Sequence, residues 1–154
     1  ALMPKLTAIV AIGIGIQIIY GAFMAGLHAG YYYNTYPKMG DHWVPPAIGM
    51  FNGFVNNILN NPITVQWIHR WLAIAVVIGI IYIWKKTKLE TSNYPLQISG
   101  ILLLSVIGFQ FLLGVLTLIT VVWLPLAILH QLGGLLLIAS MTLIIYFSNY
   151  YETT

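Results

Sequence analysis

Two histidines stand in apolar surroundings at equivalent places in the two halves of the chain. His69 follows Pro62 by seven residues and His130 follows Pro125 by five, each within a long apolar run. Ionisable groups inside a membrane-spanning helix are costly and rare, and they usually serve a function. Imidazole is also a common metal ligand. The pair therefore indicates one shared ligand site; the alternative is that each ring only donates to a carbonyl of a neighbouring helix.

The rest of the composition restricts which metal or cofactor these histidines can bind. Cysteine is absent, and no Asp or Glu lies inside the apolar runs. A closed zinc site needs four ligands, whereas a heme needs only two, because the porphyrin supplies the other four donors. His69 and His130 are therefore predicted to be the axial ligands of one heme. A copper site formed by His28, His42 and nearby methionines is disfavoured, because these residues lack a tight spacing.

The residues beside the two histidines have two interpretations. Ala73, Gly133 and Gly134 would leave room for a flat macrocycle, but small residues also allow close helix packing in membranes. Arg70 either pairs with a heme propionate, since a guanidinium matches a carboxylate, or extends to the lipid headgroups. The sequence leaves both alternatives open.

Four apolar segments must position these groups. They run roughly over 6–27, 63–84, 96–122 and 124–147, and each exceeds the length of about 20 residues that crosses a bilayer. Of the 154 residues, 60% are hydrophobic and only 6% are charged, whereas a soluble domain carries about 25% charged residues. The sequence predicts an all-α integral membrane protein: one domain over 1–154, a four-transmembrane-helix bundle surrounded by lipid, with no nucleic acid partner.

The connections between the segments predict the orientation of the bundle. Lys85, Lys86 and Lys88 lie between the second and third segments. Positively charged loops stay on the cytoplasmic or matrix side, so both termini are predicted to lie there as well. The opposite side receives the long loop 28–62, which is predicted to cap the bundle.

This loop is expected to complete the cofactor site. We predict that residues 31–46 cover the outer edge of the cofactor, with Trp43 above the ligands and Lys38 or Arg70 near the propionates. His28, at the outer end of the first segment, is expected to be a polar group above the pocket.

A short pattern repeats in the two halves of the chain. Gln17 and Gly21 lie midway along the first segment, and Gln110 and Gly114 midway along the third. In each half a segment with one histidine follows. Because the first and third segments point the same way, the repeat predicts an axis along the membrane normal that makes the two histidines equivalent.

Several stretches resemble the C-terminal half of heme A synthase. In order and with similar spacing, they are GAFMAGLHAG at 21–30, YNTYPKMG at 33–40, WVP at 43–45, NP at 61–62, VQWIHR at 65–70, LGVLT at 113–117 and LAILHQ at 126–131. That family joins two similar four-helix halves and oxidises a methyl group of heme O to the formyl group of heme A. The resemblance implies that this chain corresponds to one half and holds a heme b through His69 and His130.

The sequence departs from the family in two respects. The family often has acidic residues at the positions of His28 and Ile68. The N-terminal half has no counterpart here, including its membrane glutamate followed by a histidine one turn later, so no catalytic residue is assigned. The oxidation is therefore expected to need another copy, an N-terminal-half chain or a missing segment. Because the sequence opens at Ala1, we expect a processed or partial chain, or a half-size homologue.

The sequence supports one leading functional hypothesis and one rival hypothesis. The chain is expected to be a heme A synthase or its C-terminal half, with a bis-histidine heme b that relays electrons and with heme O and heme A as substrate and product. The rival is a non-enzymatic cytochrome b-like electron-transfer or oxidase-assembly subunit. Further expected partners are heme O synthase or a terminal oxidase. The expected location is the bacterial or archaeal plasma membrane or the mitochondrial inner membrane.

Overall fold

The computed structural model describes residues 2–90 and 93–150, and every regular element in these ranges is helical. The elements are α1 (Leu2–Gly26), η1 (Ala29–Tyr31), α2 (Phe54–Asn60), α3 (Pro62–Glu90), α4 (Tyr94–Ile119) and α5 (Leu124–Tyr150). By length and composition, α1, α3, α4 and α5 can each span a membrane. The predicted all-α four-helix membrane bundle is confirmed.

Asparagine caps fix where two of the long helices begin. Asn61 Oδ1 accepts from the backbone N–H of Ile63 at 3.0 Å, at the start of α3. Asn93 Oδ1 accepts from the backbone N–H of Leu96 at 3.0 Å, at the start of α4. Such caps satisfy donors that the first helical turn leaves without intrahelical partners.

The helix bounds differ from the predicted segment boundaries by up to six residues, and the ends of α3 and α4 show why. α3 continues to Glu90, six residues beyond the predicted end at residue 84, because its lysine-rich last turns stay helical after the apolar run has ended. α4 ends at Ile119 rather than at residue 122. Val121 and Val122 have left-handed φ angles of 55° and 58°, which β-branched residues rarely adopt, and they turn the chain into α5.

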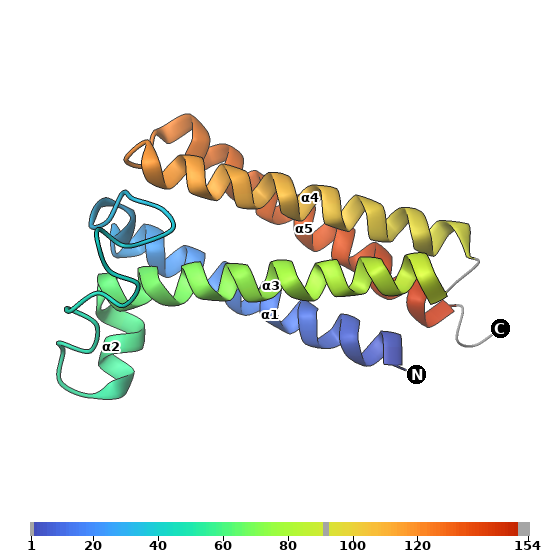
Figure 1. The fold of residues 1–154 in the computed structure, drawn as a ribbon, viewed down its shortest axis with the longest axis horizontal. Helices are drawn as coiled ribbons and strands as arrows, with labels where there is room; N and C mark the ends of the chain where they lie inside the picture. Colours follow the sequence, from blue (N-terminus) through green and yellow to red (C-terminus); the bar gives the residue numbers. More distant parts are fainter. Residues whose placement is uncertain (1, 91–92, 151–154) are drawn as a thin grey trace.

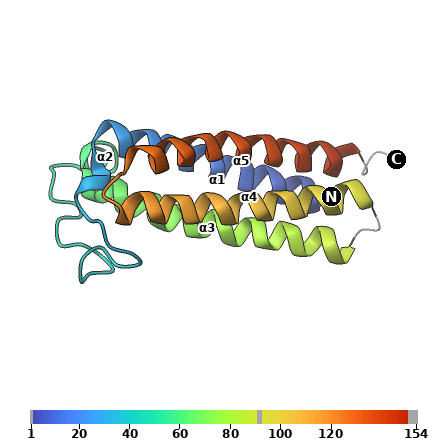
Figure 2. The ribbon, with the colours of Figure 1, turned by 90° about the horizontal axis from the view of Figure 1, so that it is seen from above.

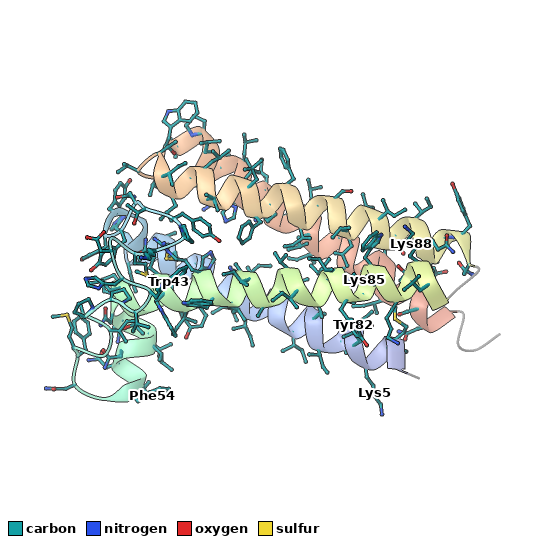
Figure 3. The ribbon with its side chains drawn as sticks, in the orientation of Figure 1. Lys5, Trp43, Phe54, Tyr82, Lys85 and Lys88 are labelled. Atoms are coloured by element: carbon teal, nitrogen blue, oxygen red, sulfur yellow. The ribbon has the colours of Figure 1, made fainter. Side chains whose placement is uncertain are left out.

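The four long helices form a ring in the order α1, α3, α4, α5 (Figures 1 and 2). Each packs against the next and α5 closes the ring against α1, so α3 and α5 lie diagonally opposite each other. The end where α1 begins is called the lysine end, and the end covered by the long loop is called the loop end. Figure 3 shows Lys5, Lys85 and Lys88 at the lysine end and Trp43 and Phe54 at the loop end.

The hydrophobic core fills much of the bundle toward the lysine end. Its buried side chains are Val10, Ile14, Val76, Ile80, Ile83, Leu96, Leu103, Ile107, Leu137, Met141 and Ile144. The helices approach closely there, since a Cβ added at Gly79 would lie 2.9 Å from Val10 Cγ2. Toward the loop end the four helices instead enclose a cavity.

Candidate functional site

The cavity has a volume of about 570 Å³ and is lined by all four long helices and by the first part of the loop. Small-molecule and cofactor sites typically occupy about 300–1,000 Å³. Most of the wall is apolar. Its polar and smallest lining residues include Gln17, Gly21, His28, Tyr31, Tyr36, His69, Arg70, Ala73, Gln110, Gly114, Thr117, His130, Gln131 and Gly134.

His69 and His130 both line this cavity. His69 is seven residues from the start of α3, and His130 is six residues from the start of α5. Both helices begin at the loop end, so each histidine lies about two helical turns below it. The structure thus brings the two histidines to one cavity from diagonally opposite helices.

Hydrogen bonds constrain both histidine rings. His130 Nδ1 lies 3.2 Å from the backbone oxygen of Gln110. A carbonyl oxygen only accepts, so this bond requires the hydrogen on Nδ1 and leaves the lone pair on Nε2, the usual state of a ligand histidine. The amide nitrogen of Gln17 lies 3.2 Å from each ring nitrogen of His69 and donates to the His69 carbonyl oxygen at 3.1 Å.

Arg70 connects α3 to the loop. Its terminal nitrogens donate to the carbonyl oxygens of Thr35 at 2.8 Å, Tyr33 at 2.9 Å and Lys38 at 3.2 Å. Its Nε is buried and has no hydrogen-bond partner among the described residues. Gln66 donates to the same Tyr33 oxygen at 2.9 Å, so one face of α3 holds the loop over the cavity.

The other predicted site residues occupy different places. His28 lines the cavity at the end of α1, with a left-handed φ of 51°. Lys38 and Trp43 are not among the cavity-lining residues. Lys38 Nζ instead lies 5.8 Å from the centre of the Trp43 ring, and the Trp43 carbonyl accepts from Trp67 Nε1 at 3.0 Å.

Further cavity residues were not singled out from the sequence. Tyr36, Thr117 and Gln131 line the cavity, and Thr117 Oγ1 is buried without a partner in the described part of the chain. Thr117 lies three residues after Gly114 on α4, so helical spacing alone could have placed both on one face. No comparable signal marks Tyr36, because it lies in irregular backbone.

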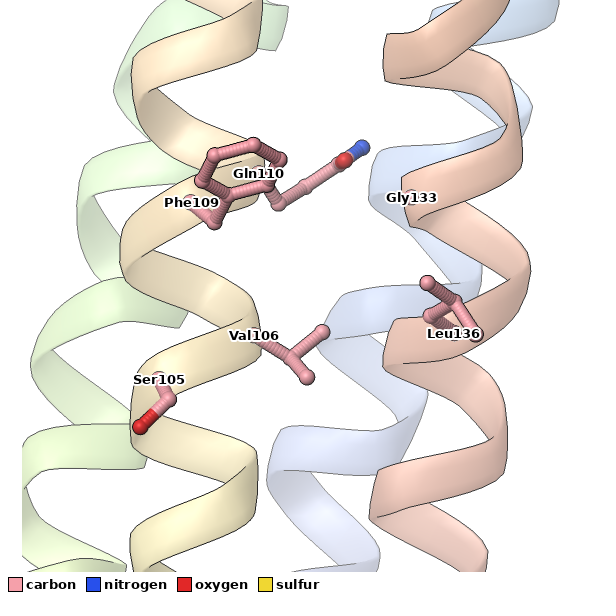
Figure 4. A pocket seen from close by; sticks show the side chains of 6 residues that line it. All are labelled: Ser105, Val106, Phe109, Gln110, Gly133 and Leu136. Atoms are coloured by element: carbon pink, nitrogen blue, oxygen red, sulfur yellow. The ribbon is translucent and has the colours of Figure 1, made fainter.

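A smaller pocket of about 190 Å³ opens between α4 and α5, and Figure 4 shows its lining side chains. Phe109 and Leu136 at this pocket are 63% and 62% exposed, so it faces the lipid side of the bundle. Gln110 lines both this pocket and the large cavity. Its side chain extends from α4 toward Gly133 on α5 (Figure 4).

The donor set of the large cavity fits a heme better than a bare metal ion. Within residues 2–90 and 93–150, no three or more His, Asp or Glu side chains form a group that could hold a metal ion. A heme requires only two protein ligands, and two histidines, His69 and His130, line the cavity. Arg70 Nε and Thr117 Oγ1 are buried donors without partners in the described ranges, and they suit the carboxylates of such a group.

Comparisons with known proteins point to one family. Residues 2–142 match the family model of the COX15-CtaA cytochrome oxidase assembly proteins. The heme A synthase of Nitrosospira multiformis is 38% identical over 122 residues, which are 79% of this chain and 34% of that protein. The heme A synthase of Rhizorhabdus wittichii is 37% identical over 139 residues, 90% of this chain and 39% of that protein. No solved structure gives a significant match.

Mitochondrial relatives give the same result. The protein named heme A synthase COX15 of Bos taurus is 38% identical over 119 residues, which cover 77% of this chain and 29% of that protein. The chain thus spans about a third of the length of these relatives. On the family match and these identities, the chain belongs to the heme A synthase family of cytochrome oxidase assembly proteins.

Proposed function

We propose that this chain is the heme-holding half of a heme A synthase and that His69 and His130 are the axial ligands of one heme b. The observation that carries the proposal is that the two histidines line a single cavity from diagonally opposite helices, at matching distances from the loop end. The family membership supports the choice of heme, because the matched relatives are named heme A synthases.

The remaining lining residues suit a cofactor that is apolar in its middle and charged at one edge. The walls are mostly apolar, and Arg70 comes from the helix face that holds the loop. Arg70 and Thr117 would bind the propionates, with His28 close to the mouth of the cavity. Lys38, which contacts Trp43, contributes to the loop rather than to the propionates in this proposal.

A heme with two imidazole ligands supplies electron transfer and has no open coordination position. In the proposed function the chain's own residues bind this group, orient the two imidazoles and exclude water from the loop end through residues 31–46. Oxidation of the heme O methyl to the heme A formyl group is a four-electron step that needs an external oxidant such as dioxygen. It would take place at a site completed by a second copy, by an N-terminal-half chain or by a further segment of a longer protein. Heme O synthase and a terminal oxidase are the proposed neighbours in the membrane.

Heme titration of the purified full chain tests the ligand assignment. The wild type is expected to bind one heme per chain, and His69→Ala and His130→Ala are each expected to weaken or abolish binding. His42→Ala is the matched control, because the His42 side chain is exposed in the loop. Wild-type binding in both ligand variants would refute the assignment.

The rival function is an electron-transfer or assembly subunit without enzymatic activity. One observation favours it: within residues 2–90 and 93–150, no Asp or Glu lines the cavity. Mass spectrometry of heme O incubated with the heme-loaded chain and a reductant, in air, separates the two functions. Formyl product from the chain alone supports the synthase, whereas product that appears only after an N-terminal-half chain is added supports the half-enzyme. Absence of product in both cases supports the rival.

A further inference from the structure

We infer that two glutamine–glycine pairs, Gln17 with Gly21 and Gln110 with Gly114, position the two histidines that the proposed function makes ligands. The inference rests on that proposed function, since it concerns the same site. Residues four apart lie on the same face of a helix, so each pair presents its two members to one neighbouring helix. The first pair lies on α1 and the second on α4.

The glutamines make the same hydrogen bond in both halves of the chain. Gln17 Nε2 donates to the backbone oxygen of His69 at 3.1 Å, and Gln110 Nε2 donates to the backbone oxygen of His130 at 2.8 Å. The first bond joins α1 to the histidine of α3, and the second joins α4 to the histidine of α5. The repeat found in the sequence is therefore also a repeat of contacts between equivalent atoms.

The glycines leave room for the imidazole rings. A Cβ added at Gly21 would lie 3.5 Å from His69 Cε1, which is ordinary van der Waals contact. A Cβ added at Gly114 would lie only 2.9 Å from His130 Cε1, so the ring or the helix would have to move. In both halves the same ring atom faces the glycine, and the fit is tighter at His130.

Packing alone does not account for these contacts. A carbonyl inside an α-helix already accepts the N–H four residues later, so neither histidine needs the glutamine to satisfy its backbone. A glutamine in the middle of a membrane span is also costly compared with an apolar residue. Gln110 contacts His130 twice, because its backbone oxygen accepts from His130 Nδ1 and its side-chain nitrogen donates to the His130 carbonyl oxygen. Gly133 leaves space for the Gln110 side-chain oxygen, which is buried without a partner in the described ranges (Figure 4).

The consequence is a fixed depth and orientation for each imidazole. Residues that hydrogen-bond to or pack against the ligand residues tune ligand basicity and the reduction potential of a heme. Loss of such residues typically weakens metal binding by about 10–100-fold. The tighter clearance at Gly114 predicts that the His130 side of the site is the more sensitive one.

The experiment uses the heme-loaded full chain and measures heme affinity, midpoint potential and the g values of the low-spin electron paramagnetic resonance (EPR) signal. The variants are Gly114→Ala, Gly21→Ala, Gln17→Met and Gln110→Met. Methionine keeps the length of glutamine and removes the amide. Gly15→Ala on α1 and Gly108→Ala on α4 are matched controls, because a Cβ at either position meets nothing within 4 Å.

Gly114→Ala is expected to shift the g values and midpoint potential and to lower heme affinity by about 10–100-fold. Gly21→Ala is expected to change all three much less, and both methionine variants to shift g values and potential relative to the controls. If Gly114→Ala does not fold, Gln110→Met decides the question.

The inference alone would be overturned if the wild type binds a low-spin heme and if Gly114→Ala and both methionine variants keep the g values, midpoint potential and heme affinity of the controls. A wild type that binds no heme would overturn the proposed function, and this inference with it.

Discussion

Replacing Arg70 by alanine should release the loop from the bundle without unfolding the four long helices. The guanidinium donates to three carbonyl oxygens of the loop, those of Tyr33, Thr35 and Lys38. Because α3 supplies all three hydrogen bonds through one side chain, a single substitution removes them together. The loop segment 31–46 then keeps the hydrogen bonds of Gln66 and Trp67 on α3, and that of Asn34 Nδ2 to the Leu118 carbonyl oxygen on α4 at 2.9 Å.

The size of the effect follows from the surroundings of these bonds. A hydrogen bond to a charged group contributes about 1.5–3 kcal/mol when it is shielded and nearer 0.5 kcal/mol when water competes. The bond to Tyr33 is partly buried, and the bonds to Thr35 and Lys38 are exposed. One shielded and two exposed bonds give about 2.5–4 kcal/mol, or a roughly 10²- to 10³-fold more frequent opening of the loop.

Hydrogen exchange followed by mass spectrometry measures this opening. The amides of Met39, Gly40 and His42 are bonded within the loop and should lose protection in Arg70→Ala, while amides in the middle of α4 and α5 keep theirs. Lys38→Ala is the matched control, because Arg70 binds the backbone oxygen of that residue. Loop protection within twofold of the wild type in Arg70→Ala would refute the reasoning, as would an equal loss in the control.

Three other predictions test different parts of the structure. The chain has no natural cysteine, so single cysteines can be placed at Lys38 and Lys86. They should react with a membrane-impermeant reagent from opposite sides of the membrane, with position 86 on the cytoplasmic or matrix side. Labelling of both positions from one side would contradict the topology. Gly133→Ala should lower the free energy of unfolding by about 1–3 kcal/mol, because the added Cβ would meet the side-chain oxygen of the α4 glutamine; an unchanged melting temperature would contradict this contact. Asn61→Ala should cost about 0.5–2 kcal/mol through loss of the α3 cap, whereas exposed Asn60→Ala should cost little; equal melting temperatures would argue against the cap.

The spans and the matched depth of the histidines could be predicted from the sequence. A continuous apolar run of more than 20 residues can satisfy its backbone in lipid only as a helix, so the four spans followed from hydropathy. His69 and His130 stand at similar distances after prolines in the first two positions of co-directional helices, which placed the histidines at similar depth. Their approach from diagonal helices required the packing order, which hydropathy does not encode.

The loop contacts could not be predicted, because their acceptors are backbone carbonyls. Arg70 binds the carbonyl oxygens of three loop residues, and any residue type supplies such an oxygen. The contacts of Gln17 and Gln110 could not be predicted for the same reason. Their spacing from glycine was visible as a repeat, but their acceptors are the histidine carbonyls. The expectation that Lys38 or Arg70 lies near the propionates stays a prediction. The contact of Lys38 Nζ with the Trp43 ring, 5.8 Å from its centre, depends on the course of the loop backbone and could not be read from the sequence.

The absorption and EPR spectra of the purified heme-loaded chain, recorded with and without carbon monoxide, test most directly whether both histidines bind the iron. Ligation by both His69 and His130 saturates the iron, so we expect a low-spin spectrum that carbon monoxide does not change. In His69→Ala or His130→Ala the same measurement should show a high-spin or carbon monoxide-sensitive heme, or no heme at all. A high-spin wild-type heme, or a low-spin spectrum that persists unchanged in both single variants, would show that His69 and His130 are not the two axial ligands.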